Sequence, residues 1–239
     1  MLTPRVLKFG GSSVADAACM RQVAALVRAA LPAAPLVVLS AMGKTTDGLV
    51  AASQGAQRGD LDRALERMRG LATAHRDAVA DLFEGRSAES LDGALAETFK
   101  RLELLLRGVA LLRELTPRTA DAIAAHGEFL STRIFAEWLR VQGVEANWLD
   151  ARRVLRTDAT FGEAQPLGER IAVLAAEHLA PLLGPGRVVV TQGYVGATED
   201  GLTTTLGRGG SDYSAALLGA AIGASEVQIW TDVEGILTC

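Results

Sequence analysis

The chain has 239 residues with a formal net charge of −4 at pH 7, and 49% of its residues are hydrophobic. This length and composition suffice for one large core. The negative balance excludes a globally basic surface, so we expect no nucleic acid partner. The most apolar region, 24–42, is broken by Arg28, Pro32 and Pro35, and we therefore expect no membrane contact.

The two cysteines, Cys19 and Cys239, lie near opposite ends of the chain and fit neither a disulfide framework nor a metal site. Such cysteine usage is typical of a reducing compartment. A strand-like segment begins almost at the N-terminus, where a signal peptide would otherwise lie. We therefore expect a cytoplasmic protein.

Short apolar segments alternate with longer segments of helical periodicity along the chain. Several of the short segments lack polar alternation, as strands buried on both faces do. The alternation predicts an α/β fold with a mainly parallel central sheet. The predicted strands are 5–9, 36–40, 145–149, 187–192 and 226–231, and the predicted helices are 14–30, 61–83, 91–114, 118–140, 167–182 and 212–222.

The region from about 52 to 116 departs from this rhythm. Apolar residues recur at helical spacing from Leu61 to Leu82 and again from Leu91 to Leu112, with Gly85 between the two runs. This pattern predicts a helical hairpin inserted between strands. Its simplest role is packing, but the same surface could serve as an interface in a homo-oligomer.

Glycines follow four of the predicted strands, at Gly10–Gly11, Gly43, Gly193 and Gly235. Ligands of parallel α/β sheets gather at the carboxyl ends of the strands. We therefore expect one edge of the sheet to carry the site.

Gly43-Lys44-Thr45 has the sequence that ends a P-loop. The leading glycine of that motif would fall at position 38, which is Val38 within a predicted strand. The loop cannot wrap a phosphate with this spacing, so a P-loop is excluded. Whether Lys44 contacts phosphate is left open.

A better phosphate site lies at the start of the chain. Lys8 is on the first predicted strand, Gly10 and Gly11 allow a ligand to approach the backbone, and Ser12 or Ser13 is expected to cap the next helix. The free N–H groups of a helix N-terminus favour anions. An ordinary strand–turn–helix with a surface lysine is the alternative.

Two further clusters combine glycine with polar groups. Residues 203–215 bring hydroxyls, Arg208, a glycine pair and Ser211, expected as an N-cap, into one loop, although a flexible polar loop is the alternative. Gly127 lies in a predicted helix, where glycine costs about 1 kcal/mol, so something must pass close to it. Its neighbour His126 is more simply explained as a core histidine than as a base. Residues 230–236 form a strand end and an acidic turn, for which Asp232 could be only a turn cap.

Together these residues resemble the aspartate kinases, which are members of the amino-acid kinase family. The resemblance runs in family order along the whole chain, and it implies a three-layer αβα sandwich that binds ATP and L-aspartate at adjoining ends of the sheet. The matching stretches are KFGGSSV at 8–14, SAMGKTTD at 40–47, HGE at 126–128, FGEA at 161–164, TQGY at 191–194, TTTLGRGGSDYSA at 203–215 and WTDVEGI at 230–236.

The resemblance also implies roles. Lys8 would be the transition-state cation and Asp212 would orient it. Glu128 would bind the α-ammonium of aspartate and Arg208 its α-carboxylate, while Ser40, Thr46 and Ser211 would add hydrogen bonds. The nucleotide would lie against Lys8, Gly10, Gly11, Ser12, Thr231, Asp232 and Gly235, with Mg²⁺ carried by its phosphates and no metal held by the protein alone.

The implied reaction moves the γ-phosphoryl group of ATP to the side-chain carboxylate of L-aspartate. A carboxylate with a pKa of about 3.9 is already ionised at neutral pH, so no general base is needed. The difficulty is repulsion between two anions, which calls for cations and N–H groups in fixed positions.

Members of this family continue beyond the point that corresponds to Cys239, into a further nucleotide contact and regulatory domains. We therefore expect residues 1–239 to be an amino-acid kinase catalytic domain, truncated at its C-terminus and without regulatory domains. Two other functions stay open: a non-catalytic amino-acid-binding module, and a related kinase that acts on glutamate or acetylglutamate.

Overall fold

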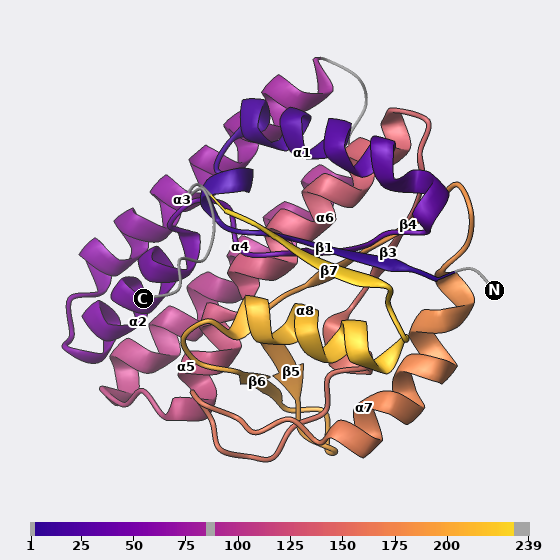
Figure 1. Ribbon diagram of the computed structural model, residues 1–239. Helices are drawn as coiled ribbons and strands as arrows, with labels where there is room; N and C mark the ends of the chain where they lie inside the picture. The colour runs from indigo at the N-terminus through magenta and orange to yellow at the C-terminus, as the bar shows by residue number, and fades with distance from the viewer. Residues whose placement is uncertain (1–2, 85–88, 232–239) are drawn as a thin grey trace, which may run out of the picture.

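The computed structural model describes residues 3–84 and 89–231, and its centre is a parallel five-stranded sheet (Figure 1). All ladders between neighbouring strands are parallel, in the order β3-β4-β2-β1-β7. The predicted α/β fold with a mainly parallel sheet is confirmed, and three strands match the predicted bounds. The strands are β1 (Arg5–Phe9), β2 (Leu36–Leu39), β3 (Glu145–Leu149), β4 (Arg187–Gln192) and β7 (Glu226–Trp230).

Helices cover both faces of the sheet, which makes three layers (Figure 1). Leu7 and Phe9 of β1 point into a large core with α1 (Ala17–Ala30), α3 (Leu61–Phe83), α4 (Glu89–Leu112) and α6 (His126–Val141). Val6 points into a smaller core on the other face, with α7 (Gly168–Leu174) and α8 (Gly210–Ala221). Because side chains alternate along a strand, Lys8 lies on the face that α8 covers.

The predicted helical hairpin is present as α3 and α4, but a further helix, α2 (Thr45–Gln57), precedes it. This helix is not among the predicted ones. Gly48 and Gly55 interrupt the periodicity of this segment, so its sequence does not resemble a helix. Tertiary packing stabilises it: Leu49, Ala52 and Ala56 are buried in the large core.

Two long predicted helices are each divided. The segment predicted as 118–140 is α5 (Pro117–Ala124) followed, after Ala125, by α6. The segment predicted as 167–182 is α7 followed by a π-helical turn (Ala175–Leu179) and a 3-10 turn (Ala180–Leu182). Pro181 explains the second division, because proline has no N–H and its ring clashes with the carbonyl four residues earlier.

Both predicted serine caps are wrong. Ser12 and Ser13 lie in a 3-10 turn (Ser12–Val14), and the N-cap of α1 is Asp16, whose Oδ1 accepts a hydrogen bond from Cys19 N at 2.8 Å. The N-cap of α8 is Gly209 with a φ of 72°, because the helix begins one residue before Ser211. In each case the turn geometry, which the sequence pattern does not show, decides the capping residue.

Asp16→Ala is expected to lower the free energy of unfolding by about 1 kcal/mol, the usual effect of losing an N-cap. Urea unfolding of the two proteins measures this difference. Ser12→Ala is the matched control, because Ser12 is exposed and makes no capping bond, and it should change stability by less than about 0.5 kcal/mol. Equal stabilities of the Asp16 variant and the wild type would contradict the cap assignment.

A short antiparallel hairpin, β5 (Val195–Ala197) with β6 (Thr203–Thr205), lies beside the main sheet and was not predicted. Asp121 of α5 fixes its position: its carboxylate accepts bonds from the N–H and the hydroxyl of Thr205, at 2.9 and 2.8 Å, and from the N–H of Gly162 at 2.9 Å. β6 leads directly into the glycine-rich loop before α8.

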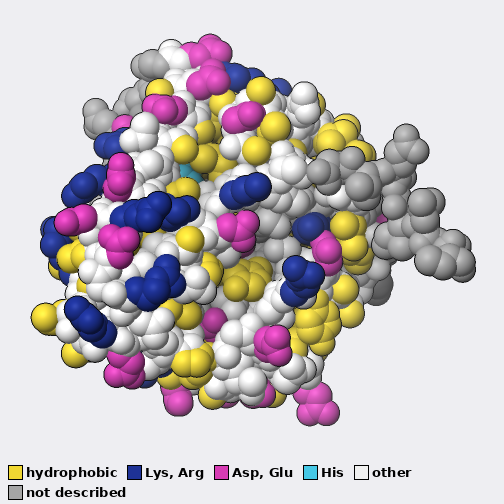
Figure 2. Space-filling view, turned by 90° about the vertical axis from the view of Figure 1, so that its left-hand side faces the viewer, with side chains coloured by type: hydrophobic (Ala, Val, Ile, Leu, Met, Phe, Trp, Pro, Cys, Tyr) yellow, Lys and Arg dark blue, Asp and Glu magenta, His cyan; other side chains and the backbone are white. Residues whose placement is uncertain are grey.

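Figure 2 looks onto the end of the molecule where β1 and β2 terminate, and charged side chains of both signs are interspersed over this face. In the described part of the chain, no helix combines the length and hydropathy needed to cross a bilayer.

Candidate active site

Lys8 and Asp212 form an ion pair at the carboxyl end of β1. Lys8 Nζ lies 2.6 Å from Asp212 Oδ1. Lys8 is buried on the α8 face of the sheet, and Asp212 is in the first turn of α8 with a half-exposed side chain. The strand therefore fixes the lysine, and the helix supplies the acid that orients it.

The pair opens into a cavity of about 240 Å³. Six residues predicted for catalysis or substrate binding line it together, although they come from four separate segments of the chain. The full lining is Lys8, Ser40, Thr46, Glu128, Tyr194, Gly207, Gly209, Gly210, Ser211 and Asp212.

Glu128 is the buried acid of this cavity, with 4% of its surface exposed. Its Oε1 accepts a hydrogen bond from Ala41 N at 3.2 Å, and Thr46 Oγ1 lies 3.4 and 3.5 Å from its two oxygens. Burial disfavours the charged form and raises the pKa of Glu128 to about 8. The carboxyl group is therefore poised to ionise when a cation enters the cavity.

Serine hydroxyls connect one wall of the cavity to the neighbouring elements. Ser40 Oγ donates to Ser211 Oγ at 3.0 Å, and the carbonyl of Ser40 accepts from Ser131 of α6 at 2.8 Å. Gly193 permits this arrangement, because a Cβ there would lie 2.6 Å from Ser211 Cβ. The end of β4 can approach α8 this closely only with glycine.

Close packing accounts for the glycine at position 127 inside a helix. A Cβ at this position would lie 2.8 Å from both Ala41 Cβ and Thr46 Oγ1. The expectation that something passes close to Gly127 is therefore correct, and the close neighbour is the segment from Ser40 to Thr46, which includes the first residues of α2. This contact brings Glu128 against that segment.

Gly127→Ala is expected to destabilise the protein and to raise the KM for the amino-acid substrate, because the added methyl pushes away the segment that holds Thr46. Urea unfolding and substrate titration measure the two effects. Gly70→Ala is the matched control: Gly70 is also inside a helix but has no neighbour within 4 Å. It should stabilise the protein by up to about 1 kcal/mol, the helix propensity difference. A similar gain for Gly127→Ala would contradict the packing argument.

Of the predicted nucleotide residues that the structure describes, Lys8 lines the cavity, whereas Gly10, Gly11, Ser12 and Thr231 do not. Gly11 packs against the segment after β2, since a Cβ there would lie 2.8 Å from Gly43 O, whereas a Cβ at Gly10 would meet only Lys8 Nζ at 3.7 Å. Ser12 and Thr231 are exposed. The predicted contacts Asp232 and Gly235 lie outside the described residues.

Two basic residues from the sequence analysis, Arg208 and Lys44, do not line the active-site cavity. Arg208 is exposed in the turn between Gly207 and Gly209, both with a φ of 72°, and its guanidinium forms no ion pair or hydrogen bond with the residues that the structure describes. Lys44 is exposed immediately before α2 and does not line the cavity.

Sequence reasoning missed Tyr194, which lines the cavity. Tyr194 has a φ of 66°, its N–H donates to Ser214 Oγ at 2.9 Å, and burial raises the pKa of its hydroxyl. Gly210 makes room for it, because a Cβ there would lie 2.9 Å from the tyrosine ring. The signals were its place directly after Gly193, at a strand end, and its position in the TQGY stretch at 191–194, which had been given no role.

Among the described residues, no three histidine, cysteine or acidic side chains are grouped closely enough to hold a metal ion. Both carboxylates of the cavity already have partners, Asp212 with Lys8 and Glu128 with the segment after β2. The donor set therefore suits a metal ion that arrives with a phosphate ligand better than a resident one.

An αβα sandwich with a lysine–acid pair and a glycine-rich loop at the carboxyl edge of its sheet is typical of phosphate-transferring enzymes. The chain belongs to the amino acid kinase family, whose model matches residues 3–239.

The particular relatives are aspartokinases. The chain is 41% identical over 98% of its length to lysine-sensitive aspartokinase 3 of Escherichia coli, and 38% identical to aspartokinase 1, chloroplastic, of Arabidopsis thaliana. It covers 50% and 41% of these proteins, so it spans about half the length of the curated relatives. The resemblance found from the motifs is confirmed.

Solved structures agree. The structure of E. coli aspartokinase III in complex with aspartate and ADP (R-state) superposes with a TM-score of 0.88 at 41% identity, over 98% of this chain and 50% of that one. The complex of the E. coli enzyme with lysine and aspartate (T-state) gives a TM-score of 0.87 at 40% identity, with the same coverage.

Proposed function

We propose that residues 1–239 are the catalytic domain of an aspartate kinase, with a helical insertion at about 52–116. The enzyme transfers the γ-phosphoryl group of ATP to the side-chain carboxylate of L-aspartate and forms 4-phospho-L-aspartate, the first step toward lysine, threonine and methionine. The observation that carries this proposal is the single cavity in which the Lys8–Asp212 pair faces the buried Glu128.

In the reaction, a carboxylate oxygen of aspartate attacks the γ-phosphorus while the bond from that phosphorus to the bridging oxygen breaks and ADP leaves. The carboxylate is ionised at neutral pH, so the protein supplies no base. Lys8 offsets the charge that builds on the transferred group, and Asp212 keeps its ammonium aimed at the cavity. Gly10 and Gly11 present backbone N–H groups to the phosphates.

The same cavity would recognise both charges of the free amino acid. Glu128 takes the α-ammonium, which stabilises its ionised form, while Ser40, Thr46 and Ser211 donate to the substrate. Arg208 takes the α-carboxylate with its planar fork. Because Arg208 is exposed without substrate, binding must turn its side chain inward, and the glycines on both sides permit this movement.

The nucleotide would lie on the β1–β7 side, against Gly10, Ser12 and Thr231. Mg²⁺ bound to its phosphates would supply further positive charge. Asp232 and Gly235 stay proposed contacts of the nucleotide.

An ADP-release assay on the longest native protein and on the 239-residue chain tests the proposal. We expect turnover with L-aspartate and none with N-acetyl-L-glutamate, because an acylated amine cannot pair with Glu128. Turnover with N-acetyl-L-glutamate instead would favour a related amino-acid kinase. Saturable aspartate binding without ADP release from either protein would favour a non-catalytic binding module.

A further inference from the structure

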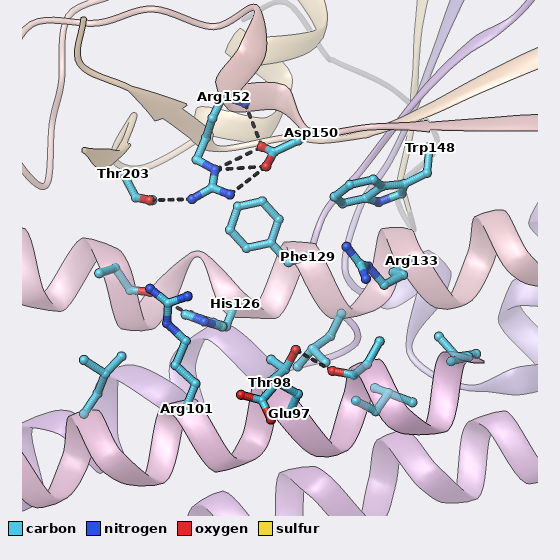
Figure 3. A pocket seen from close by; sticks show the side chains of 16 residues that line it. Glu97, Thr98, Arg101, His126, Phe129, Arg133, Trp148, Asp150, Arg152 and Thr203 are labelled. Atoms are coloured by element: carbon cyan, nitrogen blue, oxygen red, sulfur yellow. Dashed lines mark hydrogen bonds and ion pairs between the residues drawn. The ribbon is translucent and has the colours of Figure 1, made fainter. Parts of the chain in front are cut away.

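A second cavity, of about 450 Å³, lies along α6 and is shown in Figure 3. Its walls come from α4, α6, the end of β3 and the residues that follow it. It shares no lining residue with the active-site cavity, and no step of the proposed reaction uses it. Its volume is in the range of small-molecule sites.

Three arginines from separate elements line this cavity: Arg101 of α4, Arg133 of α6 and Arg152 after β3. Arg152 already has an acid partner, Asp150, at 2.6 Å. Arg101 and Arg133 form no ion pair with any side chain that the structure describes; the side chains of 85–90 are not among these. Two guanidinium groups that lack a carboxylate at one cavity attract an anion.

The carboxylates that line the cavity do not neutralise Arg101 and Arg133. Asp150 is taken by Arg152. Glu97 is exposed and lies four residues before Arg101 on α4, the spacing of a helical ion pair, yet the two form no ion pair.

Aromatic rings stack against two of the three arginines. The guanidinium of Arg133 lies 4.6 Å from the centre of the Trp148 ring, and that of Arg152 lies 4.6 Å from the centre of Phe129. Trp148 is itself fixed, because its Nε1 donates to Thr132 Oγ1 at 3.0 Å. Stacking uses the face of a guanidinium and leaves N–H groups at its edge for a ligand.

His126 completes the polar wall. Its Nδ1 lies 2.7 Å from the carbonyl of Ala122, and burial, with smaller contributions from Arg101 and Arg152, lowers its pKa. A neutral ring that donates from Nδ1 to this carbonyl presents Nε2 as an acceptor, and it adds no further positive charge.

We propose that this cavity is a second ligand site, for a small carboxylate with a flat apolar body. The carboxylate pairs with Arg101 and Arg133, and the body packs on Phe129 and the leucines of α4 that line the cavity. The site goes beyond the proposed kinase reaction. It is independent of that reaction, because His126, Phe129 and Arg133 lie on one side of α6 while Glu128 points into the active site.

The test uses 3-phenylpropanoate as the probe and the neutral 3-phenylpropanamide as its isostere. The readout is the indole N–H signal of Trp148 in ¹H–¹⁵N spectra of the full chain, at fixed ionic strength. We expect a saturable shift with the carboxylate and binding at least about tenfold weaker with the amide, because charge-assisted hydrogen bonds are lost. Equal binding of the two compounds, or no saturable shift with the carboxylate, would overturn the proposal.

Variants locate the binding. Arg101→Gln and Arg133→Gln change exposed residues and should each weaken the carboxylate at least about tenfold, whereas Arg69→Gln, on the exposed surface of α3, should not. Ala94→Phe keeps every charge but fills the cavity and should abolish the shift. Wild-type affinity in both arginine variants, or in a folded Ala94→Phe variant, would place the probe elsewhere and refute the site.

Discussion

Lys8→Ala is expected to lower kcat by about 100-fold or more, the usual effect of removing a preorganised group that stabilises charge in the transition state. The ammonium is fixed on the sheet and paired at 2.6 Å with Asp212. The lining of the cavity contains no other lysine or arginine that could replace it. An ADP-release assay at saturating aspartate and ATP measures the effect.

The fold should tolerate this change. The side chain of Asp212 is 48% exposed, so removing Lys8 does not leave a buried charge without a partner. Lys100→Ala is the control for loss of a lysine, because Lys100 is exposed on α4 and lines neither cavity. A folded Lys8 variant with activity within a few-fold of wild type would remove this residue from the mechanism.

Glu128→Gln should lower kcat/KM for aspartate by at least about 100-fold, mainly through KM, and leave the KM for ATP unchanged. The substitution keeps the shape of the side chain but leaves the α-ammonium of the substrate without its buried counter-charge, and breaking such a pair costs about 3–5 kcal/mol. Initial rates over a range of aspartate concentrations give both constants. An unchanged KM for aspartate would show that another group binds the ammonium.

The pH dependence of the same variant tests the assignment independently. In the unliganded protein the pKa of Glu128 is about 8, and only its ionised form pairs with the substrate. For the wild type, kcat/KM for aspartate should therefore rise as the pH approaches about 8, and Glu128→Gln should abolish this rise. A persistent rise with that midpoint in the variant would assign it to a different group.

The free energy of unfolding should fall over the pH range in which kcat/KM for aspartate rises. The folded-state pKa lies above the ordinary value of 4.5, so the folded protein binds a proton that the unfolded chain has released. The stabilisation that comes from this bound proton is complete below pH 4.5 and is lost as the pH rises toward about 8. It is absent from Glu128→Gln. Unfolding free energies of both proteins across this window measure the difference.

The sheet and much of the site could be predicted because their signals are local. Strands such as Arg187–Gln192 are compact apolar runs, and the polar residues after them must converge where parallel strands end. Lys8, Glu128 and Ser211 were found on this basis and through the family motifs, and they line one cavity.

Other features depend on packing that no short pattern reports. α2 contains two glycines and is held by the large core, and β5 and β6 have only three residues each. The left-handed backbone of Tyr194 and the exposed position of Arg208 follow from how the loops fold together. The arginine-lined cavity joins α4, α6 and the end of β3, and no contiguous motif contains its residues.

The segment from Ser40 to Thr46 packs against two glycines, Gly11 after β1 and Gly127 of α6. At each of them an added Cβ would lie 2.8 Å from an atom of the segment. Enlarging either glycine would displace this segment as a whole, so it is a poor way to alter which amino acid the proposed site accepts. New selectivity must come from exchanging the side chains that face inward, with Thr46 and Ser211 as the first positions to randomise.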